Sequence, residues 1–518
     1  MPEHVTSAGL VPVSKDKVVW RLAAFASLVS VASFYYFSHK GVVLAYKDAI
    51  SHMEIARRVI DSPTTGFGQL GGVWLPLPHL LMLPFIWNDQ LYYAGLAGSL
   101  ISMASYVVTS VLLYKIVLSL TGKRLPAVVS ALVFMSNPGV LYMQSTPMTE
   151  LLLFACMVGM VYAVQRWIQT DNYTYLLAAG VAAFLGTLTR YEAWALLLAL
   201  TAVAVLAAWR KGYARVKIEG TVLAFLFVAG AGIVAWMGWN LLIFGNALNF
   251  QNGKYAKPSL WVGSGDITIG HWSLALKTYW FAVVDNISLP GLALLLLGLL
   301  VMLLWEPFSL QILPTLSLLS LFPFFVVALE KGQRPLHVTQ LTGDLYNVRF
   351  GLLMILPAAI LSGYSVRAFQ NPSPLRGFTV IALAAAVAAT SVPQLLNIDR
   401  IATVHEPLRW QHSTTDTGVG AANFMKKHYD NGKILAQFFG SEDVLFDARI
   451  ALANNVYEGS YKQWEPDIAA PAEHHIRWIV VRYKDRGDEL NVRLNRTKLK
   501  QFYSEVYHNG QFSIFRRT

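Results

Sequence analysis

The segment from residue 44 to residue 62 (LAYKDAISHMEIARRVIDS) sets several charged residues between two strongly apolar runs. Its acids are Asp48, Glu54 and Asp61, and its bases are Lys47, Arg57 and Arg58. Asp48 and His52 are four residues apart, so they share one face of a helix. Glu54 and Arg58 share another face by the same spacing. An acid in a cleft, with a pKa set by partial burial, can take a proton from a substrate, whereas a solvated interfacial helix with intrahelical ion pairs would show the same spacing.

A second candidate acid lies in the segment 136–154 (SNPGVLYMQSTPMTELLLF). The letters NPG are expected to end one helix, and TPMTE to begin another with Thr146 as its cap. Glu150 then falls in the first turn of a span, where the helix dipole stabilises a carboxylate. Its neighbours are apolar, and an acid at membrane depth is by default a candidate functional residue. Both roles stay open for Glu150.

A tight turn at residues 187–194 (TLTRYEAW) joins two of the apolar runs. Arg190 and Glu192 lie at its centre and are close enough in sequence for a local ion pair. The alternative is that Arg190 or Tyr191 lines the same cleft as the acids.

The segment 343–357 (GDLYNVRFGLLMILP) leads into a late apolar run and carries Asp344, Tyr346 and Arg349. Arg349 either snorkels to the membrane surface or binds a phosphate, for which its planar guanidinium is suited. The loop before it also holds Lys331, Arg334 and His337, which would add positive potential.

The elements that must position these residues are membrane helices. The chain has 518 residues, of which 55% are hydrophobic and 14% charged, against about 25% charged in soluble proteins. Apolar runs such as residues 291–304 recur and are long enough to span a bilayer. In a membrane protein, the net charge of +11 indicates topology and contacts with lipid headgroups rather than nucleic acid. The single cysteine, Cys156, excludes an internal disulfide.

We expect about eleven spans, the first being a retained helix rather than a cleaved signal. They are residues 18–38, 91–118, 125–142, 148–166, 173–189, 192–209, 218–243, 289–305, 309–329, 350–366 and 377–396. Residues 272–285 are expected to form an interfacial helix. Lys and Arg residues in the short loops place the N-terminus inside and, with an odd span count, the C-terminus outside.

From about residue 400 the composition becomes that of a soluble domain. Residues 433–439 and 477–483 are expected as strands, residues 418–429 as a helix, and the Asn-Gly within 507–515 as a hairpin turn. The sequence therefore predicts a transmembrane domain over residues 1–399. It also predicts an extracytoplasmic α/β domain over residues 400–518.

The remaining motifs indicate surface positions and exclude some chemistry. Residues 71–85 are rich in proline, so we expect them to lie along the membrane interface with Trp74 and His79 as anchors. His474 and His475 have no further ligands at useful spacing and are expected on the surface. The sequence has no phosphate-binding Walker loop, dinucleotide fingerprint or Gly-x-Ser-x-Gly elbow, which argues against an ATP-driven pump or a serine hydrolase.

Taken in order, these motifs resemble the GT-C superfamily of membrane glycosyltransferases. The resemblance is strongest to the protein O-mannosyltransferase and lipid A aminoarabinose transferase branch. That branch has a first outer loop like Asp-Glu-x-x-Tyr-x-x-Ile-Ala-Arg followed by Pro-Pro-Leu, matched here by DAISHMEIAR (48–57) and LPLPHLL (75–81). Here Ala49 replaces the second acid and His52 the tyrosine. PMTEL (147–151) and RFGLLMILP (349–357) match later motifs.

The resemblance implies an inverting transfer of a sugar from a polyprenyl-phosphate donor to an acceptor hydroxyl on the outer face. Asp48 would be the catalytic base, which contributes about 10²- to 10⁴-fold in such reactions. The departing lipid phosphate needs fixed cations. The donor phosphate would be bound by Arg349, Lys331 and Arg334, and the substrate by Glu150, His52, Arg190, Tyr191 and Tyr346.

The expected partners are the donor lipid, membrane lipids, and an acceptor that is a protein, a lipid or a glycan. No catalytic metal, cofactor or nucleic acid is expected, since the Trp-Trp-Asp motif of the metal-dependent oligosaccharyltransferases is absent. We expect a bacterial or archaeal cytoplasmic membrane rather than the endoplasmic reticulum. The alternative is a lipid or sugar transporter, although neither internal repeats nor gapped helices are evident.

Overall fold

The computed structural model describes residues 16–305, 309–367, 391–411, 418–483, 485 and 487–518. The chain forms two compact units. Unit 1 comprises residues 1–40, 100–145 and 149–406. Unit 2 comprises residues 41–99, 146–148 and 407–518. Each unit is described by itself.

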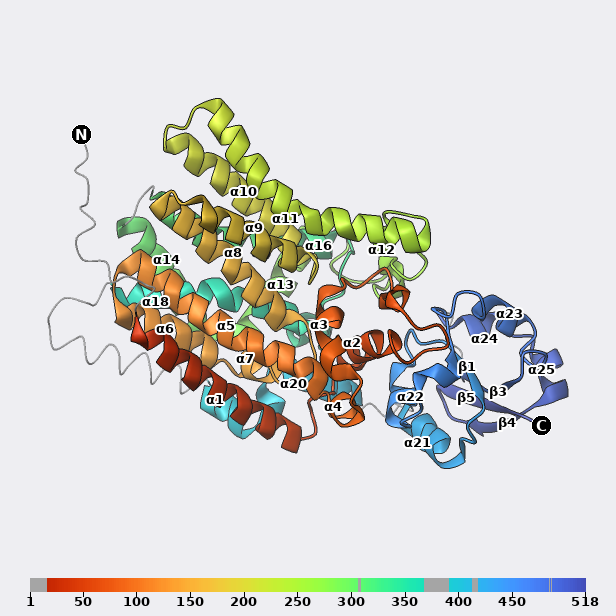
Figure 1. Cartoon of the computed structure of the whole chain (residues 1–518). Helices are drawn as coiled ribbons and strands as arrows, with labels where there is room; N and C mark the ends of the chain where they lie inside the picture. The colour runs from red at the N-terminus through yellow and green to blue at the C-terminus, as the bar shows by residue number, and fades with distance from the viewer. Residues whose placement is uncertain (1–15, 306–308, 368–390, 412–417, 484, 486) are drawn as a thin grey trace. The chain divides into compact units, whose positions relative to one another are not determined.

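Unit 1 is helical (Figure 1). Its longer helices are α1 (Lys17–His39), α5 (Leu96–Thr121, in this unit from Leu100), α6 (Arg124–Met135), α8 (Glu150–Thr170), α9 (Tyr173–Thr187), α10 (Glu192–Arg210), α11 (Arg215–Phe244), α13 (Trp272–Ile287), α14 (Leu289–Trp305), α16 (Leu321–Glu330), α18 (Ile355–Arg367) and α20 (Ala402–Gln411). Its short helices are α7 (Pro138–Met143), α12 (Asn249–Asn252), η3 (Pro258–Leu260), η4 (Leu310–Ile312), α15 (Leu313–Ser317), η5 (Leu318–Ser320), α17 (Thr339–Thr342), η6 (Val348–Met354) and η7 (Ile398–Arg400). Helix α18 packs against α6 and α14, and α9 packs against α8 and α11.

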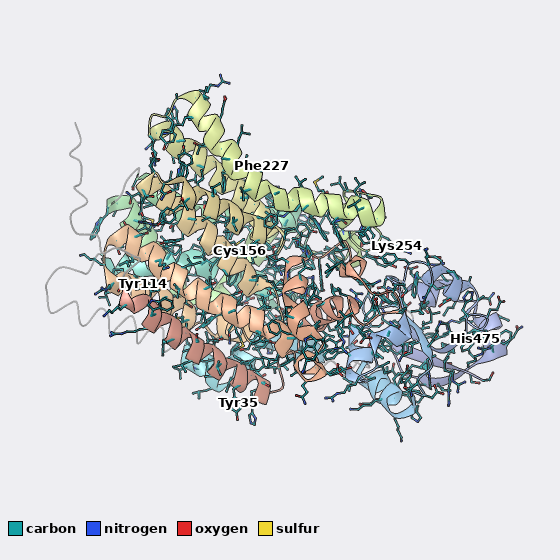
Figure 2. The ribbon with its side chains drawn as sticks, in the orientation of Figure 1. Tyr35, Tyr114, Cys156, Phe227, Lys254 and His475 are labelled. Carbon is teal, nitrogen blue, oxygen red and sulfur yellow. The ribbon has the colours of Figure 1, made fainter. Side chains whose placement is uncertain are left out.

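Within the described residues, seven helical runs are long and apolar enough to cross a membrane. They are Lys17–His39, Leu96–Thr121, Glu150–Thr170, Glu192–Arg210, Arg215–Phe244, Leu310–Glu330 and Val348–Val366. A bent pair, α13 and α14, would make an eighth. Exposed apolar side chains such as Phe227 on α11, 84% exposed (labelled in Figure 2), suit a lipid-facing surface, whereas Cys156 on α8 is buried.

Two of the expected spans differ from the structure. Residues 125–142 form two helices rather than one: Pro138 begins α7, and the side chain of Asn137 caps it by accepting a hydrogen bond from Val140 N at 3.0 Å. Residues 173–189 give the 15-residue α9, shorter than a full span. Residues 377–396 lie largely outside the described part of the chain.

The expected interfacial helix and the span after it are two arms of one bent element. Helices α13 and α14 meet at an angle of 102°. Ser288 between them has a φ of 69°, and Pro290 lies in the first turn of α14, where its missing N–H costs nothing. A left-handed residue followed closely by proline therefore turns the chain where the apolar pattern alone continues.

Unit 2 contains the predicted α/β fold. Its helices are α2 (Lys47–Arg58), η2 (Phe67–Leu70), α3 (Leu77–Ile86), α4 (Asp89–Tyr93), α21 (Gly418–His428), α22 (Glu442–Asp447), η8 (Leu452–Asn454), α23 (Trp464–Ala469), α24 (Glu489–Arg493) and α25 (Arg496–Phe502). Its strands are β1 (Lys433–Ala436), β2 (Asn455–Val456), β3 (Ile476–Arg482), β4 (Tyr503–His508) and β5 (Phe512–Arg517). The sheet order is β2-β1-β3-β5-β4.

The sheet combines parallel and antiparallel pairing. Strand β1 is parallel to β2 and β3, with Ile434 opposite Trp478. Strands β3, β5 and β4 are antiparallel. Because side chains alternate along a strand, Ile434 and Trp478 enter one core with α21 and α22, while Leu435 and Ile479 enter the core on the other face. The predicted Asn-Gly turn joins β4 to β5, with Phe512 N bonded to the side chain of Asn509 at 2.7 Å.

Residues 41–99 pack with the sheet inside unit 2. Helix α2 contacts α22, and the loop after α2 meets the segment after β2. Tyr461 donates to Gly68 O at 2.7 Å, and Gln69 donates to Gly459 O at 3.1 Å. Ala453 N donates to Asp61 at 2.9 Å. The first loop and the C-terminal sheet thus share one unit although about 350 residues of sequence separate them.

Candidate active site

Glu150 is the centre of a buried charged cluster in unit 1. It begins α8, as the sequence predicted, but the helix starts three residues later than expected, with Thr149 rather than Thr146 at the capping position. Its Oε1 atom accepts a hydrogen bond from Arg190 Nη1 at 3.1 Å and another from Arg349 Nε at 3.1 Å. One carboxylate oxygen therefore joins arginines from two separate loops.

Arg190 makes the predicted local pair and also reaches further. Its Nη2 donates to Glu192 Oε1 at 2.9 Å, and its Nη1 donates to Thr149 Oγ1 at 3.0 Å as well as to Glu150. Burial alone would lower the pKa of Arg190, but the charges of Glu192 and Glu150 raise it. The guanidinium of Arg190, in the turn between α9 and α10, is thus held in place by Glu192, Glu150 and Thr149.

Arg349 is buried rather than snorkelling, and a residue that the sequence analysis missed positions it. Glu406 on α20 accepts hydrogen bonds from Asn347 N at 2.7 Å and Val348 N at 2.9 Å. Asn347 is in the left-handed region with a φ of 55°. Glu406 Oε1 also lies 3.7 Å from Arg349 Nη1. The carboxylate therefore holds the turn into η6 and the guanidinium that follows it.

Arg334 is the cation of this cluster that no carboxylate contacts. Its side chain makes no hydrogen bond or ion pair with any residue that the structure describes. Burial lowers its pKa, and the charge of Glu192 opposes that effect while the charges of Arg190 and Arg349 add to it. These electrostatic couplings place Arg334 with the buried arginines and leave its guanidinium able to bind an anion.

The two predicted tyrosines have distinct surroundings. The ring of Tyr191 stacks on Phe250 with centroids 5.7 Å apart, and its hydroxyl accepts from Trp236 Nε1 at 3.3 Å. Burial raises the pKa of Tyr191, and the charge of Arg334 opposes this. Tyr346 instead pairs its backbone with that of His337 in an isolated bridge. Tyr191 therefore borders the arginine cluster.

The other two basic residues of the loop are held by neighbouring acids. Lys331 is exposed, with 62% of its side chain accessible, and pairs with Glu330 at 3.1 Å. His337 Nδ1 lies 2.8 Å from Asp344 Oδ2, and its Nε2 lies 3.4 Å from Asp266 Oδ2. The hydrogen bond to Asp266 and the one to Asp344 raise the pKa of His337 to about 9. This histidine is therefore charged at neutral pH and fastens the loop.

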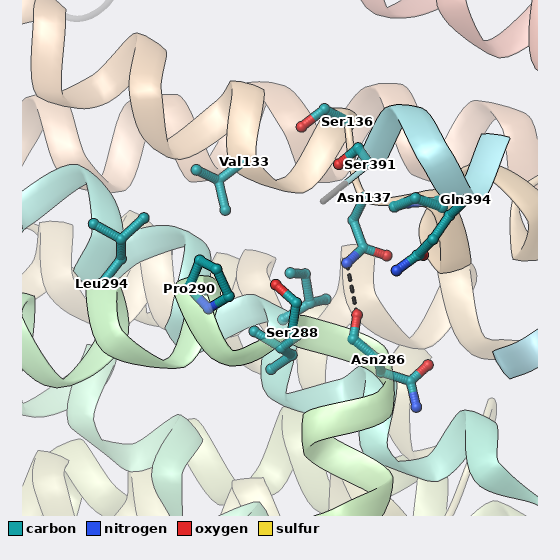
Figure 3. A pocket seen from close by; sticks show the side chains of 13 residues that line it. Val133, Ser136, Asn137, Asn286, Ser288, Pro290, Leu294, Ser391 and Gln394 are labelled. Atoms are coloured by element: carbon teal, nitrogen blue, oxygen red, sulfur yellow. Dashed lines mark hydrogen bonds between the residues drawn. The ribbon is translucent and has the colours of Figure 1, made fainter. Parts of the chain in front are cut away.

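A small cavity lies between the end of α6, the start of α7 and the bend from α13 to α14 (Figure 3). Its volume is about 40 Å³, and polar side chains from α6, α7 and the α13–α14 bend line it. Asn137 Nδ2 donates to Asn286 O at 2.8 Å, the bond drawn in Figure 3. The side chain of Asn286 in turn donates to Val348 O at 2.8 Å. Asn286, next to the bend, thus holds Val348, the residue before Arg349.

Asp48 and His52 lie in unit 2, on α2. The expectation of a solvated helix is wrong, because the residues between positions 49 and 54 are buried. Asp48 lies half-buried in the first turn, and His52 is buried one turn later. The ring of Trp74 lies against His52 with centroids 4.3 Å apart.

His79 is not the interface anchor that the sequence suggested. It is fully buried, and its Nε2 shares a hydrogen bond with His52 Nδ1 at 2.9 Å. Burial, together with the neighbouring His52 and Arg58, lowers the pKa of His79. A neutral imidazole accordingly fixes the ring of His52. The sequence analysis missed this pair because the two histidines are 27 residues apart. The proline-rich segment around His79 predicted a position at the membrane interface instead.

Residues 94–236 match the family of dolichyl-phosphate-mannose-protein mannosyltransferases. The structure of ArnT from Cupriavidus metallidurans bound to undecaprenyl phosphate is similar, with a TM-score of 0.60 and 12% identity over 96% of this chain and 97% of that chain. The chain has a GT-C glycosyltransferase fold. The apo structure of the same ArnT gives a TM-score of 0.57 at 12% identity, with the same coverage of 96% and 97%.

An oligosaccharyltransferase from Archaeoglobus fulgidus matches at a TM-score of 0.47 and 12% identity, covering 90% of this chain and 70% of that chain, which is too weak to carry an argument. No curated protein matches the sequence at a significant level. The apolar helices of the described residues are long enough for a multi-pass membrane protein.

Proposed function

We propose that this chain is an inverting glycosyltransferase that moves a sugar from a polyprenyl-phosphate donor to an acceptor hydroxyl on the outer face of the membrane. The observation that carries the proposal is the cluster of Arg190, Arg349 and Arg334, buried at Arg349 and half-buried at the other two, on a GT-C fold. Two of these arginines are fixed by Glu150, and Arg334 contacts no acid in the described structure. Such a preorganised cation suits a phosphate on which negative charge develops.

In the proposed reaction, the acceptor oxygen attacks the anomeric carbon as the bond from that carbon to the donor phosphate breaks. Asp48 takes the proton of the acceptor hydroxyl, and the electron pair of the broken bond leaves with the lipid phosphate. Arg334 binds the leaving phosphate, and Arg349 supports it from the fixed side of the cluster. His52, Tyr191 and Tyr346 are proposed to bind substrate, and Lys331 to add positive potential at the surface.

The likeness to ArnT supports a polyprenyl phosphate as donor carrier, since that structure holds undecaprenyl phosphate. The identity of the sugar and of the acceptor is left to experiment. A transporter is favoured by one observation, the break between α13 and α14. Transporters with inverted repeats carry such breaks in corresponding halves, whereas in the described residues only this pair is bent in that way.

The proposal is tested with purified protein in nanodiscs and a panel of radiolabelled polyprenyl-phosphate hexoses and pentoses. The wild type is expected to consume one donor, and Asp48→Asn to lower kcat about 10²- to 10⁴-fold because the general base is lost. Asp399→Asn, which changes an exposed aspartate of η7, serves as the matched control and keeps full activity. Full turnover by Asp48→Asn would remove this residue as the base. Donor counterflow without consumption would instead establish a transporter.

A further inference from the structure

Glu54 is a buried carboxylate without a partner. It lies in the middle of α2, is 1% exposed, and neither of its oxygens has a hydrogen-bond partner within the described residues. Burying an unpaired charged carboxylate is unfavourable, so such a group tends to take up a proton when the protein folds. Geometry alone therefore makes this side chain a neutral acid in the docked helix.

The surroundings of Glu54 are acidic. The pKa of Glu54 is raised well above its usual value. Burial is the largest cause, and the negative charge of Glu442 is the next. The charges of Asp443 and Asp447 also raise this pKa. All three lie on α22, which packs against α2. Arg58 opposes the shift, but no ion pair joins it to Glu54 in the described structure.

Arg58 is engaged elsewhere. Its guanidinium lies over the rings of Phe438 and Tyr457, 5.1 Å from each centroid, and its Nε atom is buried without a partner. The hydroxyl of Tyr92 on α4 is also buried without a partner, and its pKa is raised by burial and by the charge of Glu54. The described helices α3 and α22, which pack against α2, carry no Lys or Arg side chain.

Few titratable side chains lie on α3, η2 and η8, which also pack against α2. Helix α3 brings only His79, whose pKa is lowered, and η2 and η8 carry no titratable side chain. The groups that face Glu54 are Arg58, Tyr92, Glu442, Asp443 and Asp447. Lys47, at the first turn of α2, pairs with Asp443 at 3.0 Å. Helix α2 is thus fastened to α22 at its start by an ion pair and, further along, rests on it through Glu54.

We propose that Glu54 is a positioning residue for Asp48: it keeps α2 docked on α22 only while its carboxyl is protonated. Asp48 follows Lys47 directly, so its place is set by the docking of α2. The role of Asp48 as a base rests on the proposed function, whereas the docking of α2 stands by itself.

The direction of the pH response follows from the raised pKa of Glu54. Below the usual glutamate pKa, the carboxyl is protonated both docked and released, and docking is complete. As pH rises above that value, the released helix ionises more readily, so docking weakens. Burial also raises the pKa of Glu442 to about 7, so its ionisation near neutral pH adds negative charge in front of Glu54. Docking therefore loosens as pH rises through neutral.

Hydrogen exchange of the α2 amides tests the proposal without any measure of activity. The full chain in nanodiscs is compared between pH 5.5 and 8.5 after correction for intrinsic exchange rates. We expect α2 to open at least about tenfold more often at the higher pH, since one pKa unit of differential protonation is a factor of ten. Glu54→Gln, which mimics the protonated acid, should keep the acidic level of protection throughout.

Two further variants make the result decisive. Glu505→Gln changes an exposed glutamate of β4 and should keep the wild-type response. Glu54→Leu, which has no charge to bury, should also lose the pH dependence, so the test survives if one variant folds poorly. Protection of wild-type α2 that does not change with pH, or loss of protection in Glu54→Gln at pH 5.5, would overturn the proposal.

Activity adds the link to Asp48. If the chain transfers sugar, wild-type kcat should fall at alkaline pH, and Glu54→Gln should retain it with KM for the donor unchanged. If kcat falls equally at alkaline pH in the wild type and in Glu54→Gln, Glu54 does not position Asp48. If no sugar is transferred while α2 shows the expected exchange, the proposed function fails and the pH-dependent docking of α2 remains.

Discussion

At the scale of residues, two glutamates, Glu150 and Glu406, fix the positions of Arg190 and Arg349 in unit 1. Glu150 bridges Arg190 and Arg349 through one oxygen, and Glu406 holds the turn that precedes Arg349. Because buried charges are costly unless paired, these arginines are fixed before any substrate arrives. Arg334 differs, since no acid of the described structure contacts it. Arg334 is therefore the residue that we propose to bind the donor phosphate.

Arg334→Ala tests this assignment. A hydrogen bond to a charged group is worth roughly 1.5–3 kcal/mol, so the Kd for a polyprenyl-phosphate donor should rise about 10- to 100-fold. Lys331→Ala is the matched control, because Lys331 lies on the same loop but is exposed and paired with Glu330. Titration calorimetry with the donor, or with the lipid phosphate alone, measures both. Equal loss of affinity in the two variants would indicate a general field effect instead of a direct contact.

At the scale of elements, short segments between the helices position the candidate residues. The loop from α16 to η6 carries Arg334 and Arg349, and His337 fastens it through Asp344 and Asp266. The bend at Ser288 lets Asn286 hold the turn into η6. The loop and the bend interrupt the regular helices. Side chains there, such as His337 and Asn286, make the hydrogen bonds that hold the candidate residues.

The loop should open at high pH. The pKa of His337 is raised above its unfolded value, to about 9. Its stabilisation is therefore complete below about 6.5, the unfolded value, and is lost as pH rises through about 9. We expect the thermal unfolding midpoint to fall over that range in wild type and to be flatter in His337→Asn. His508→Asn, at an exposed histidine of β4, should leave the slope unchanged; a slope equally steep in His337→Asn would assign the effect to other groups.

At the scale of the whole molecule, the chain combines a helical unit of membrane-spanning length with a unit built around a mixed sheet. The GT-C fold accounts for both in one chain, because the match to ArnT covers 96% of it. The orientation of the chain is a prediction from its basic loops. That prediction would place unit 2, with its sheet and α2, on the outer face.

Single-cysteine labelling tests the orientation. Cys156 is buried and is the only cysteine, so Cys156→Ser gives a clean background. In intact cells, Val419→Cys on α21 should react with an impermeant maleimide, and Lys123→Cys in the loop before α6 should react only after lysis. Both positions are exposed. The reverse pattern would invert the orientation and place the proposed chemistry on the inner face.

The sequence by itself determined what depends on local pattern. Apolar runs of membrane length, the strands β1 and β3, the Asn-Gly hairpin and the local pair of Arg190 with Glu192 all follow from spacing over a few residues. The prediction of Glu150 in a first turn was also confirmed. These features are readable because helix and strand periodicities act over one or two turns.

Only the tertiary structure decided which polar residues meet. Glu150 and Arg349 are 199 residues apart in sequence, and Glu406 lies 59 residues beyond Asn347, whose backbone it binds. Helix α2 has an amphipathic pattern that fits a solvated surface, yet it is buried because α22 covers it. The pairing of His52 with His79 and the unpartnered Glu54 depend on that same packing. Long-range packing sets which charges are desolvated and paired, and no local periodicity encodes it.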